Sequence, residues 1–202
     1  MVKIAIFDYG AGNIFSLKNS LEKNNAQVEI ITSFDNTNSY DGLFLPGVGN
    51  FDPAIKSIRD FSKTDFKDYV RNNIPVFGIC LGMEMFFEKS EEGKEKGLGV
   101  IDGEVILLPS KMKIPHMGWN NIQIEKSSKI LEEVPNQSWV YFVHSYRVKP
   151  KNDNVIVAES DYGIKVPAVI ESKNFFGTQF HPEKSGNIGS VMIENFLREC
   201  KK

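Results

Sequence analysis

Short apolar runs alternate with helical patterns through the first part of the chain, and this alternation restricts the possible folds more than any other feature. The runs have the length and the β-branched and aromatic content of buried strands, and they cover residues 3–9, 27–32, 41–47 and 74–80. Strands separated by helices of this length form βαβ units. The sequence therefore predicts a mostly parallel sheet.

Three helices are expected among these strands. Asn13 has the residue type of an N-cap and precedes a run with apolar residues at helical spacing. A second helix has Asp52 as its expected N-cap and Pro53 at its first position. A third is expected to continue from the fourth strand through residues 81–90.

Beyond residue 97 the pattern changes to strands and turns. Strands are expected at 104–109, 120–125, 139–148, 154–159, 166–172 and 175–180, before a final helix at 187–198. The polar stretch 89–97 reads as an exposed loop. A chain of 202 residues fits one core. We expect one α/β domain over residues 1–202, with a mostly parallel central sheet flanked by helices and additional antiparallel strands in its second half.

Charge and cysteine content exclude several classes of function. The formal net charge is -2, from 24 basic and 26 acidic residues, which gives no basic footprint for nucleic acid. The sequence has no apolar run of about 18 residues for a membrane span and no signal peptide, so we expect a soluble, cytoplasmic protein. The two cysteines, Cys80 and Cys200, have neither disulfide-framework nor zinc-site spacing. No metal or cofactor is expected, and Cys200 is expected to have no chemical role.

Three of the predicted strands end on unusual residues. These ends are Gly10 to Asn13, Pro46 to Gly49 and Gly78 to Gly82. Parallel sheets bind their ligands at the carboxyl ends of strands, so the three ends predict one site. A dinucleotide site is disfavoured, because Phe15 stands at the third glycine position of the fingerprint and no acidic residue clearly ends the second strand.

Cys80 lies between glycines at the junction of the fourth strand and the following helix. Flanking glycines at such a junction are typical of a nucleophile elbow, and the N-terminus of a helix favours a thiolate over a thiol. The alternative is an inert buried cysteine, since free cysteine is among the most buried residue types. The stretch alone favours the inert residue.

A nucleophilic thiolate needs a base, and the base needs a group that orients it. His181 opens the stretch His181-Pro182-Glu183, in which Glu183 can fix the imidazole tautomer. A surface histidine beside a solvated glutamate is the commoner reading of an isolated stretch of this kind. His116 and His144 are the competing bases, but neither has an acid two or three residues away.

Acyl transfer also needs main-chain N–H groups that stabilise the oxyanion. The N–H of Leu81, directly after the cysteine, is one candidate. A second is expected from Gly47, Val48 and Gly49, because glycine lets the backbone approach closely or rotate a peptide. An ordinary strand-ending turn is the alternative for this stretch.

The motifs GICLG (78–82), PGVG (46–49) and HPE (181–183) together resemble the class I, or triad, glutamine amidotransferases. Within that superfamily, six motifs in order along the chain resemble the glutaminase subunits of imidazole glycerol phosphate synthase. They are DYGAGN (8–13), LPGVG (45–49), GICLGM (78–83), PHMGWN (115–120), YFVHSYR (141–147) and QFHPEKSG (179–186).

The resemblance implies a triad of Cys80, His181 and Glu183 and an oxyanion strand at residues 47–49 in which a peptide flips when the partner binds its ligand. It implies hydrolysis of L-glutamine to glutamate and ammonia through a thioester at the cysteine. The ammonia passes into a (β/α)8 synthase subunit, which makes imidazole glycerol phosphate and the by-product AICAR. That partner would form a heterodimer with this chain.

The resemblance also implies contact residues. Substrate contacts fall on Gly82, Glu84, His144, Ser145 and Tyr146, and the partner surface on Asn13, Trp119, Tyr141 and Lys184. For Lys184, a solvated surface lysine is the alternative. Glu84 departs from the family, which usually has glutamine there. A carboxylate at this position would attract the substrate's α-ammonium, repel its α-carboxylate and raise the pKa of Cys80. A Glu84 that faces the surface would be harmless.

Three alternatives share much of this pattern. A paralogous pair would use the same glutaminase chemistry to supply a synthase in surface-sugar amidotransfer, and Glu84 favours this reading slightly. A catalytically silent docking subunit would hold the barrel without chemistry, which the complete set of catalytic residues disfavours. The glutaminase of pyridoxal phosphate synthesis shares the elbow and triad, but PHMGWN and YFVHSYR favour the first family.

Overall fold

The computed structural model describes residues 1–10, 13–33, 40–60, 66 and 74–201. Ala11 and Gly12 of the predicted strand-ending turn therefore lie outside the described residues. None of the described helices is both long and apolar enough to cross a membrane.

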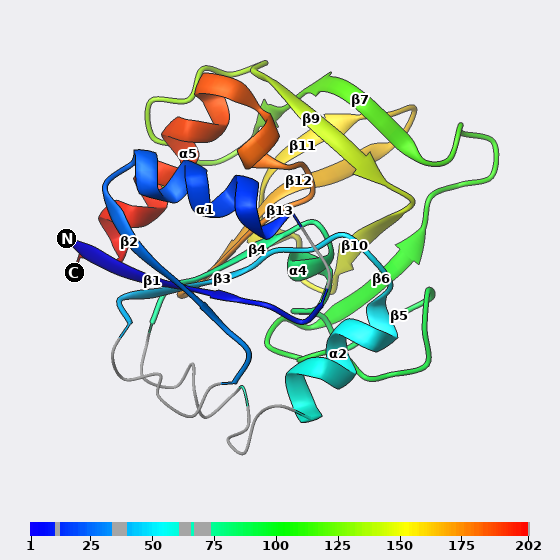
Figure 1. The fold of residues 1–202 in the computed structure, drawn as a ribbon. Helices are drawn as coiled ribbons and strands as arrows, with labels where there is room; N and C mark the ends of the chain where they lie inside the picture. The colour runs from blue at the N-terminus through cyan, green and yellow to red at the C-terminus, as the bar shows by residue number, and fades with distance from the viewer. Residues whose placement is uncertain (11–12, 34–39, 61–65, 67–73, 202) are drawn as a thin grey trace.

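One eight-stranded sheet forms the centre of the molecule (Figure 1). Its order is β2 (Ala26–Ile31), β1 (Val2–Phe7), β3 (Gly42–Leu45), β4 (Val76–Ile79), β13 (Phe175–Thr178), β12 (Lys165–Ser172), β11 (Ile156–Asp161) and β8 (Gln123–Ile124). The five strands from β2 to β13 pair in parallel, and β12, β11 and β8 continue the sheet antiparallel. The predicted fold class is confirmed.

Helices cover both faces of this sheet. The helices α1 (Ile14–Lys23) and α5 (Gly186–Glu199) lie on one face and α2 (Phe51–Asp60) on the other (Figure 1). Side chains alternate between the faces of a strand. Ile4 and Ile6 of β1 accordingly pack in the core under α1 and α5, whereas Ala5 and Phe7 pack in the core under α2.

The second half adds two small sheets. The strands β5 (Lys89–Ser90), β6 (Gly103–Leu107) and β10 (Tyr146–Pro150) form one, and β7 (His116–Asn121) pairs antiparallel with β9 (Trp139–His144) in the other. Single 3-10 turns occur at η2 (Lys129–Leu131), η3 (Asp153–Val155) and η4 (Pro182–Lys184). The single strand predicted at 139–148 is therefore wrong, since the chain changes sheets at Ser145.

The helix expected over residues 81–90 is also wrong. The helix α4 (Leu81–Glu84) is one turn long. The main-chain N–H of Leu98 donates to the carbonyl of Met85 (2.8 Å), and that of Val100 donates to the carbonyl of Phe86 (2.9 Å). A longer helix would need those carbonyls for its own ladder. Tertiary hydrogen bonds therefore end the helix.

Two predicted helix caps differ from the structure. Asn13 occupies the N-cap position of α1, but its side chain makes no capping hydrogen bond. Helix α2 begins at Phe51, so Asp52 lies in its first turn. The Asp52 carboxylate instead accepts main-chain N–H groups of Lys94 (3.0 Å) and Glu95 (2.9 Å).

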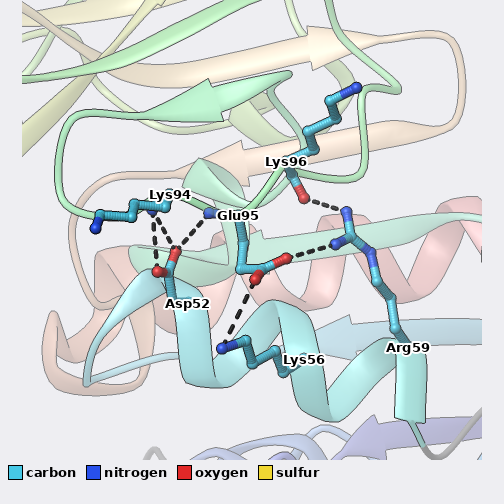
Figure 2. A network of polar contacts seen from close by, with 6 residues as sticks. All are labelled: Asp52, Lys56, Arg59, Lys94, Glu95 and Lys96. Atoms are coloured by element: carbon cyan, nitrogen blue, oxygen red, sulfur yellow. Dashed lines mark hydrogen bonds and ion pairs between the residues drawn. The ribbon is translucent and has the colours of Figure 1, made fainter.

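The stretch 89–97, predicted as an exposed loop, contains strand β5 and is attached to α2 (Figure 2). Glu95 forms ion pairs with Lys56 (3.6 Å) and Arg59 (3.0 Å), and Arg59 donates to the carbonyl of Lys96. With the two N–H groups bound by Asp52, these contacts hold the stretch against the helix. It is a fixed part of the wall beside the carboxyl ends of the strands.

Candidate active site

Cys80 follows β4 in a conformation that L-residues rarely adopt, with φ 53° and ψ −108°. Close packing enforces the turn. A Cβ atom on Gly78 would lie 2.6 Å from Met83 N, and one on Gly82 would lie 1.8 Å from the carbonyl oxygen of Leu45. Larger residues cannot stand at either flank. The predicted elbow is therefore present in the backbone.

The Cys80 thiol is buried, at 7% exposure. Its Sγ lies 3.8 Å from the carbonyl oxygen of Val143 and 3.8 Å from Nε2 of Gln179. Burial raises the pKa of Cys80 well above its ordinary value, and the neighbouring carboxyl of Glu84 raises it further, whereas the N–H of Leu81 lowers it. The expectation that the helix start favours a thiolate is thus wrong for the free chain. A one-turn helix offers too few N–H groups to offset the loss of solvation.

His181 and Glu183 form a buried pair directly after the neighbouring strand β13. His181 Nδ1 lies 2.8 Å from Glu183 Oε1, and the two side chains are 2% and 4% exposed. A carboxylate only accepts hydrogen bonds, so Nδ1 carries the proton and Nε2 presents a lone pair. Within the described residues, His181 Nε2 is buried with no hydrogen-bond partner. The hydrogen bond to Glu183 fixes the ring, and Nε2 makes no hydrogen bond with the Cys80 thiol.

The competing histidines bind each other. His144 Nδ1 lies 2.7 Å from the carbonyl oxygen of Tyr146, which can only accept, so His144 Nε2 in turn accepts from His116 Nδ1 (2.9 Å). Burial lowers the pKa of His144 to about 3 and that of His116 to about 4, so both are neutral at physiological pH. Both ring nitrogens of His144 are occupied, which leaves His181 as the available base.

Strand β9 fixes the loop that carries His181. The N–H of His181 donates to the carbonyl of Tyr141 (2.9 Å), and the N–H of Tyr141 donates to Ser185 Oγ (3.0 Å). Ser185 Oγ donates in turn to the carbonyl of His181 (2.6 Å). These three hydrogen bonds tie the backbone of the histidine to that of the strand.

A cavity of about 290 Å³ opens beside the thiol. Its lining includes most of the predicted site residues, namely Val48, Gly49, Cys80, Leu81, Glu84, His144, Ser145 and Tyr146. Gly47, Gly82, His181 and Glu183 are not in the lining. Gly47 packs against Tyr9 and Leu81, and Gly82 against the carbonyl of Leu45, so their missing side chains permit close packing.

Sequence reasoning missed three residues of this region. Glu92 lines the cavity, and its carboxylate accepts the N–H of Phe51 (2.9 Å) at the start of α2. Gln179, fully buried, donates from Nε2 to Glu84 Oε1 (3.0 Å) as well as lying near the thiol. Tyr9 places a buried hydroxyl against Gly47. All three depend on tertiary contacts, although Gln179 and Tyr9 stand inside quoted motifs.

Glu84 does not face the surface. It is 4% exposed, and Gln179 is the donor to its carboxyl group. Burial raises the pKa of Glu84 to about 8, and the neighbouring Glu92 raises it as well. Burial also raises the pKa of Glu92. At neutral pH Glu84 is therefore largely a neutral carboxylic acid, which donates and accepts hydrogen bonds as an amide does.

Three of the four predicted partner-surface residues lie together. The rings of Trp119 and Tyr141 are 6.0 Å apart at 72°, and Lys184 Nζ lies 5.9 Å from the Tyr141 ring centre. Trp119 is 53% exposed. Asn13 lies at the start of α1, a helix that packs against η4, the turn carrying Lys184. These residues lie near the loop that carries His181.

Comparison with known proteins identifies the class. Residues 5–200 match the family model "Glutamine amidotransferase class-I", so the chain belongs to that class. The structure superposes on PurLQS from Thermotoga maritima with a TM-score of 0.77 at 18% identity, covering 98% of this chain and 99% of that one. A putative GMP synthase protein from Thermoplasma acidophilum gives a TM-score of 0.75 at 21% identity, covering 100% and 94%. Both share the fold.

Relatives of higher sequence identity show which family within this class the chain belongs to. The imidazole glycerol phosphate synthase subunit HisH of Methanocaldococcus jannaschii is 45% identical over 96% of this chain and 98% of its own. The HisH subunits of Aquifex aeolicus and Prochlorococcus marinus are 41% and 40% identical over 100% of this chain and 99% and 97% of theirs. Within the class, the chain belongs to the HisH family of glutamine amidotransferase subunits.

Proposed function

We propose that this chain hydrolyses L-glutamine to glutamate and ammonia through a γ-glutamyl thioester at Cys80. The ammonia supplies a (β/α)8 synthase subunit that makes imidazole glycerol phosphate and AICAR in histidine biosynthesis. The observation that carries the proposal is the strained Cys80 at the end of β4, together with the buried His181–Glu183 pair that follows the adjacent strand β13. We expect the enzyme to work in the cytoplasm.

The protonated thiol of the free chain requires a base. In the first step His181 Nε2 takes the thiol proton, and the sulfur attacks the amide carbon of glutamine. The N–H groups of Leu81 and of the oxyanion strand stabilise the oxyanion that forms. His181 then returns the proton to the departing nitrogen, which leaves as ammonia. Water, activated by the same imidazole, hydrolyses the thioester to glutamate and regenerates the thiol, while Glu183 holds the tautomer throughout.

Two carboxyl groups and several polar groups in the cavity match the charged end of glutamine. Glu92, whose carboxylate accepts the N–H of Phe51, would bind the α-ammonium. Glu84, largely neutral at that pH, would offer a hydrogen bond without repelling the α-carboxylate. Ser145 and Tyr146 complete the polar wall.

The outer face of the β7–β9 pair would receive the synthase. Met117, Trp119 and Trp139 are 62%, 53% and 58% exposed on these two strands, and exposed aromatic and methionine side chains are typical of interfaces. Tyr141 and Lys184 continue this surface to the histidine loop. A partner docked here would lie beside the cavity from which ammonia leaves, as a heterodimer that channels ammonia requires.

The deciding experiment is ammonia and glutamate release from glutamine, with and without the histidine-pathway synthase and its ligand. We expect little release by the chain alone and strong stimulation by the complex. High activity without the partner would contradict an oxyanion strand gated by the partner. No turnover and no thioester in the complex would instead indicate a docking subunit.

A second candidate keeps the chemistry and changes the partner. The buried Glu84, where the family usually has glutamine, favours a paralogous synthase in surface-sugar amidotransfer. Stimulation by that synthase and not by the histidine-pathway one would establish it. The same assay therefore separates both candidates.

A further inference from the structure

Tyr9 places an unpaired hydroxyl inside the protein at the carboxyl end of β1. The residue is 7% exposed, and its hydroxyl oxygen has no hydrogen-bond partner within the described residues. Buried hydroxyls nearly always find a partner, because an unpaired one costs stability. Its ring stacks on Phe7, with centroids 6.3 Å apart at 27°, which fixes the direction of the hydroxyl.

The hydroxyl lies against the oxyanion strand. A Cβ atom placed on Gly47 would be 2.5 Å from Tyr9 Oη and 2.6 Å from the Cβ of Leu81. Tyr9 and Gly47 are absent from the cavity lining, whereas Val48 and Gly49, the next residues of the strand, belong to it. The hydroxyl therefore contacts the strand at a point outside the cavity.

Peptide geometry links these two positions. The C=O of Gly47 and the N–H of Val48 belong to one planar trans peptide and point in opposite directions. An oxyanion hole needs an N–H directed into the cavity. When the N–H of Val48 turns toward the cavity, the carbonyl of Gly47 must turn away from it, and Tyr9 is the side-chain donor beside Gly47.

We propose that Tyr9 is a positioning residue for the oxyanion strand, donating a hydrogen bond to the Gly47 carbonyl when the Val48 N–H faces the cavity. This inference rests on the proposed glutaminase activity. In the present conformation this hydrogen bond is not made. The hydroxyl gains its partner only when the Val48 N–H faces the cavity.

Tyr9 keeps the proton that this role requires. Burial raises the pKa of its hydroxyl well above the ordinary value, and the nearby Cys80 and Glu84 raise it further. The group is a hydrogen-bond donor throughout the working pH range. A carbonyl oxygen, which only accepts, is the complementary partner.

The test is Tyr9→Phe in the complex with the synthase that stimulates the wild-type chain. The kcat of glutamine hydrolysis should fall about tenfold, equal to about 1.4 kcal/mol. The KM for glutamine should not change, because Tyr9 does not line the cavity. Ammonia-dependent turnover should also be unchanged. The melting temperature should stay the same or rise, because the variant removes an unpaired buried hydroxyl.

Tyr162→Phe is the matched control. Its hydroxyl is paired, since it donates to the carbonyl of Lys113 (2.9 Å), and Tyr162 is not in the cavity lining. This variant should lower the melting temperature and leave the kcat for glutamine unchanged. Tyr9→Phe should thus lower turnover without lowering stability, and Tyr162→Phe should lower stability without lowering turnover.

Three results would overturn the role of Tyr9. The first is an unchanged kcat for glutamine in Tyr9→Phe. The second is a parallel loss of ammonia-dependent turnover and melting temperature, which would mean a structural role. The third is a shifted pH dependence of Cys80 alkylation, which would mean that the hydroxyl acts on the thiol. Absence of glutamine turnover in the wild-type complex would instead refute the proposed function itself.

Discussion

The two cysteines of this chain have the same burial and very different surroundings. Cys80 and Cys200 are each 7% exposed, and burial raises the pKa of both thiols. Cys200 ends α5 with an ordinary φ of −69°, and its sulfur packs over Gly42. Cys80 has a φ of 53° and lies beside Gln179, whereas a cavity adjoins each of the two cysteines.

The difference separates the proposed nucleophile from an ordinary buried cysteine. Neither burial nor a raised thiol pKa separates the two residues. The separating features are a strained backbone, which costs about 1–3 kcal/mol, and a set of directed polar groups at one of the two sulfurs. Cys200, without these features, acts as a small apolar side chain between α5 and the sheet.

Removing each sulfur gives the largest contrast. Cys80→Ala should lower glutamine-dependent turnover of the complex by more than about 1,000-fold, because no thioester can form. Ammonia-dependent turnover should persist. Cys200→Ala should leave both activities within about twofold. Glutamate release and synthase turnover are the measurements, and loss of both activities in Cys80→Ala would mean that the residue maintains the fold or the interface.

Covalent labelling tests the same contrast without mutation. A glutamine-like electrophile added to the complex should modify Cys80 at least about 100 times faster than Cys200, because only Cys80 lies in the strained turn beside the proposed oxyanion strand. Peptide mass spectrometry measures the two rates. Comparable labelling of both cysteines would show that exposure alone governs their reactivity.

The pH dependence of reactivity should distinguish Cys80 from Cys200 by a smaller factor. The pKa of Glu84 is about 8 in the folded chain, and its ionisation disfavours the Cys80 thiolate. The kcat for glutamine should therefore fall several-fold above about pH 8 in the wild type. Glu84→Gln should lack this decline and retain at least wild-type activity at pH 7. Alkylation of Cys200 should be identical in both proteins.

The pH dependence of the free energy of unfolding, compared between the wild type and Glu84→Gln, is the control for that prediction. Glu84 binds its proton in the folded state between its ordinary pKa of 4.5 and about 8, where the unfolded state has lost it. The free energy of unfolding of the wild type should thus decrease as pH rises through this range, relative to Glu84→Gln. Urea unfolding at several pH values measures it. Parallel curves for the two proteins would show that Glu84 ionises normally.

The smallest expected effect concerns packing at Cys200. A Cβ atom on Gly42 would lie 2.4 Å from its sulfur and 3.1 Å from Cδ1 of Ile4. Gly42→Ala should cost about 1–3 kcal/mol of stability. Adding Cys200→Ala should recover part of that loss, which urea unfolding of the four proteins in a double-mutant cycle would show. Strict additivity would mean that Ile4 or the backbone causes the strain.

Contiguous patterns made much of the fold and site predictable. The alternation of apolar runs and helices fixed the parallel half of the sheet, and the glycines around Cys80 indicated the elbow. Hydrogen bonding from residues 98 and 100, which shortens α4, depends on a return of the chain that no local pattern shows. Glu92 reaches the cavity because Asp52 and Glu95 attach its stretch to α2, again through distant residues.

The incorrect expectation about the thiolate has a physical cause as well. Sequence shows that a helix starts after Cys80, but the length of that helix and the burial of the sulfur are tertiary properties. No motif predicts the unpaired hydroxyl of Tyr9 either. Whether a buried hydroxyl has a hydrogen-bond partner depends on the side chains and backbone that the fold places around it.

The three hydrogen bonds between His181, Tyr141 and Ser185 have a consequence for the history of such subunits. Strand β9 offers side chains to the proposed partner surface while its backbone holds His181, the proposed general base. A substitution that adapts this strand to a new synthase also perturbs the imidazole. Recognition of a partner and competence for hydrolysis are therefore inherited together, and a lineage that exchanges one synthase for another must retune both at once.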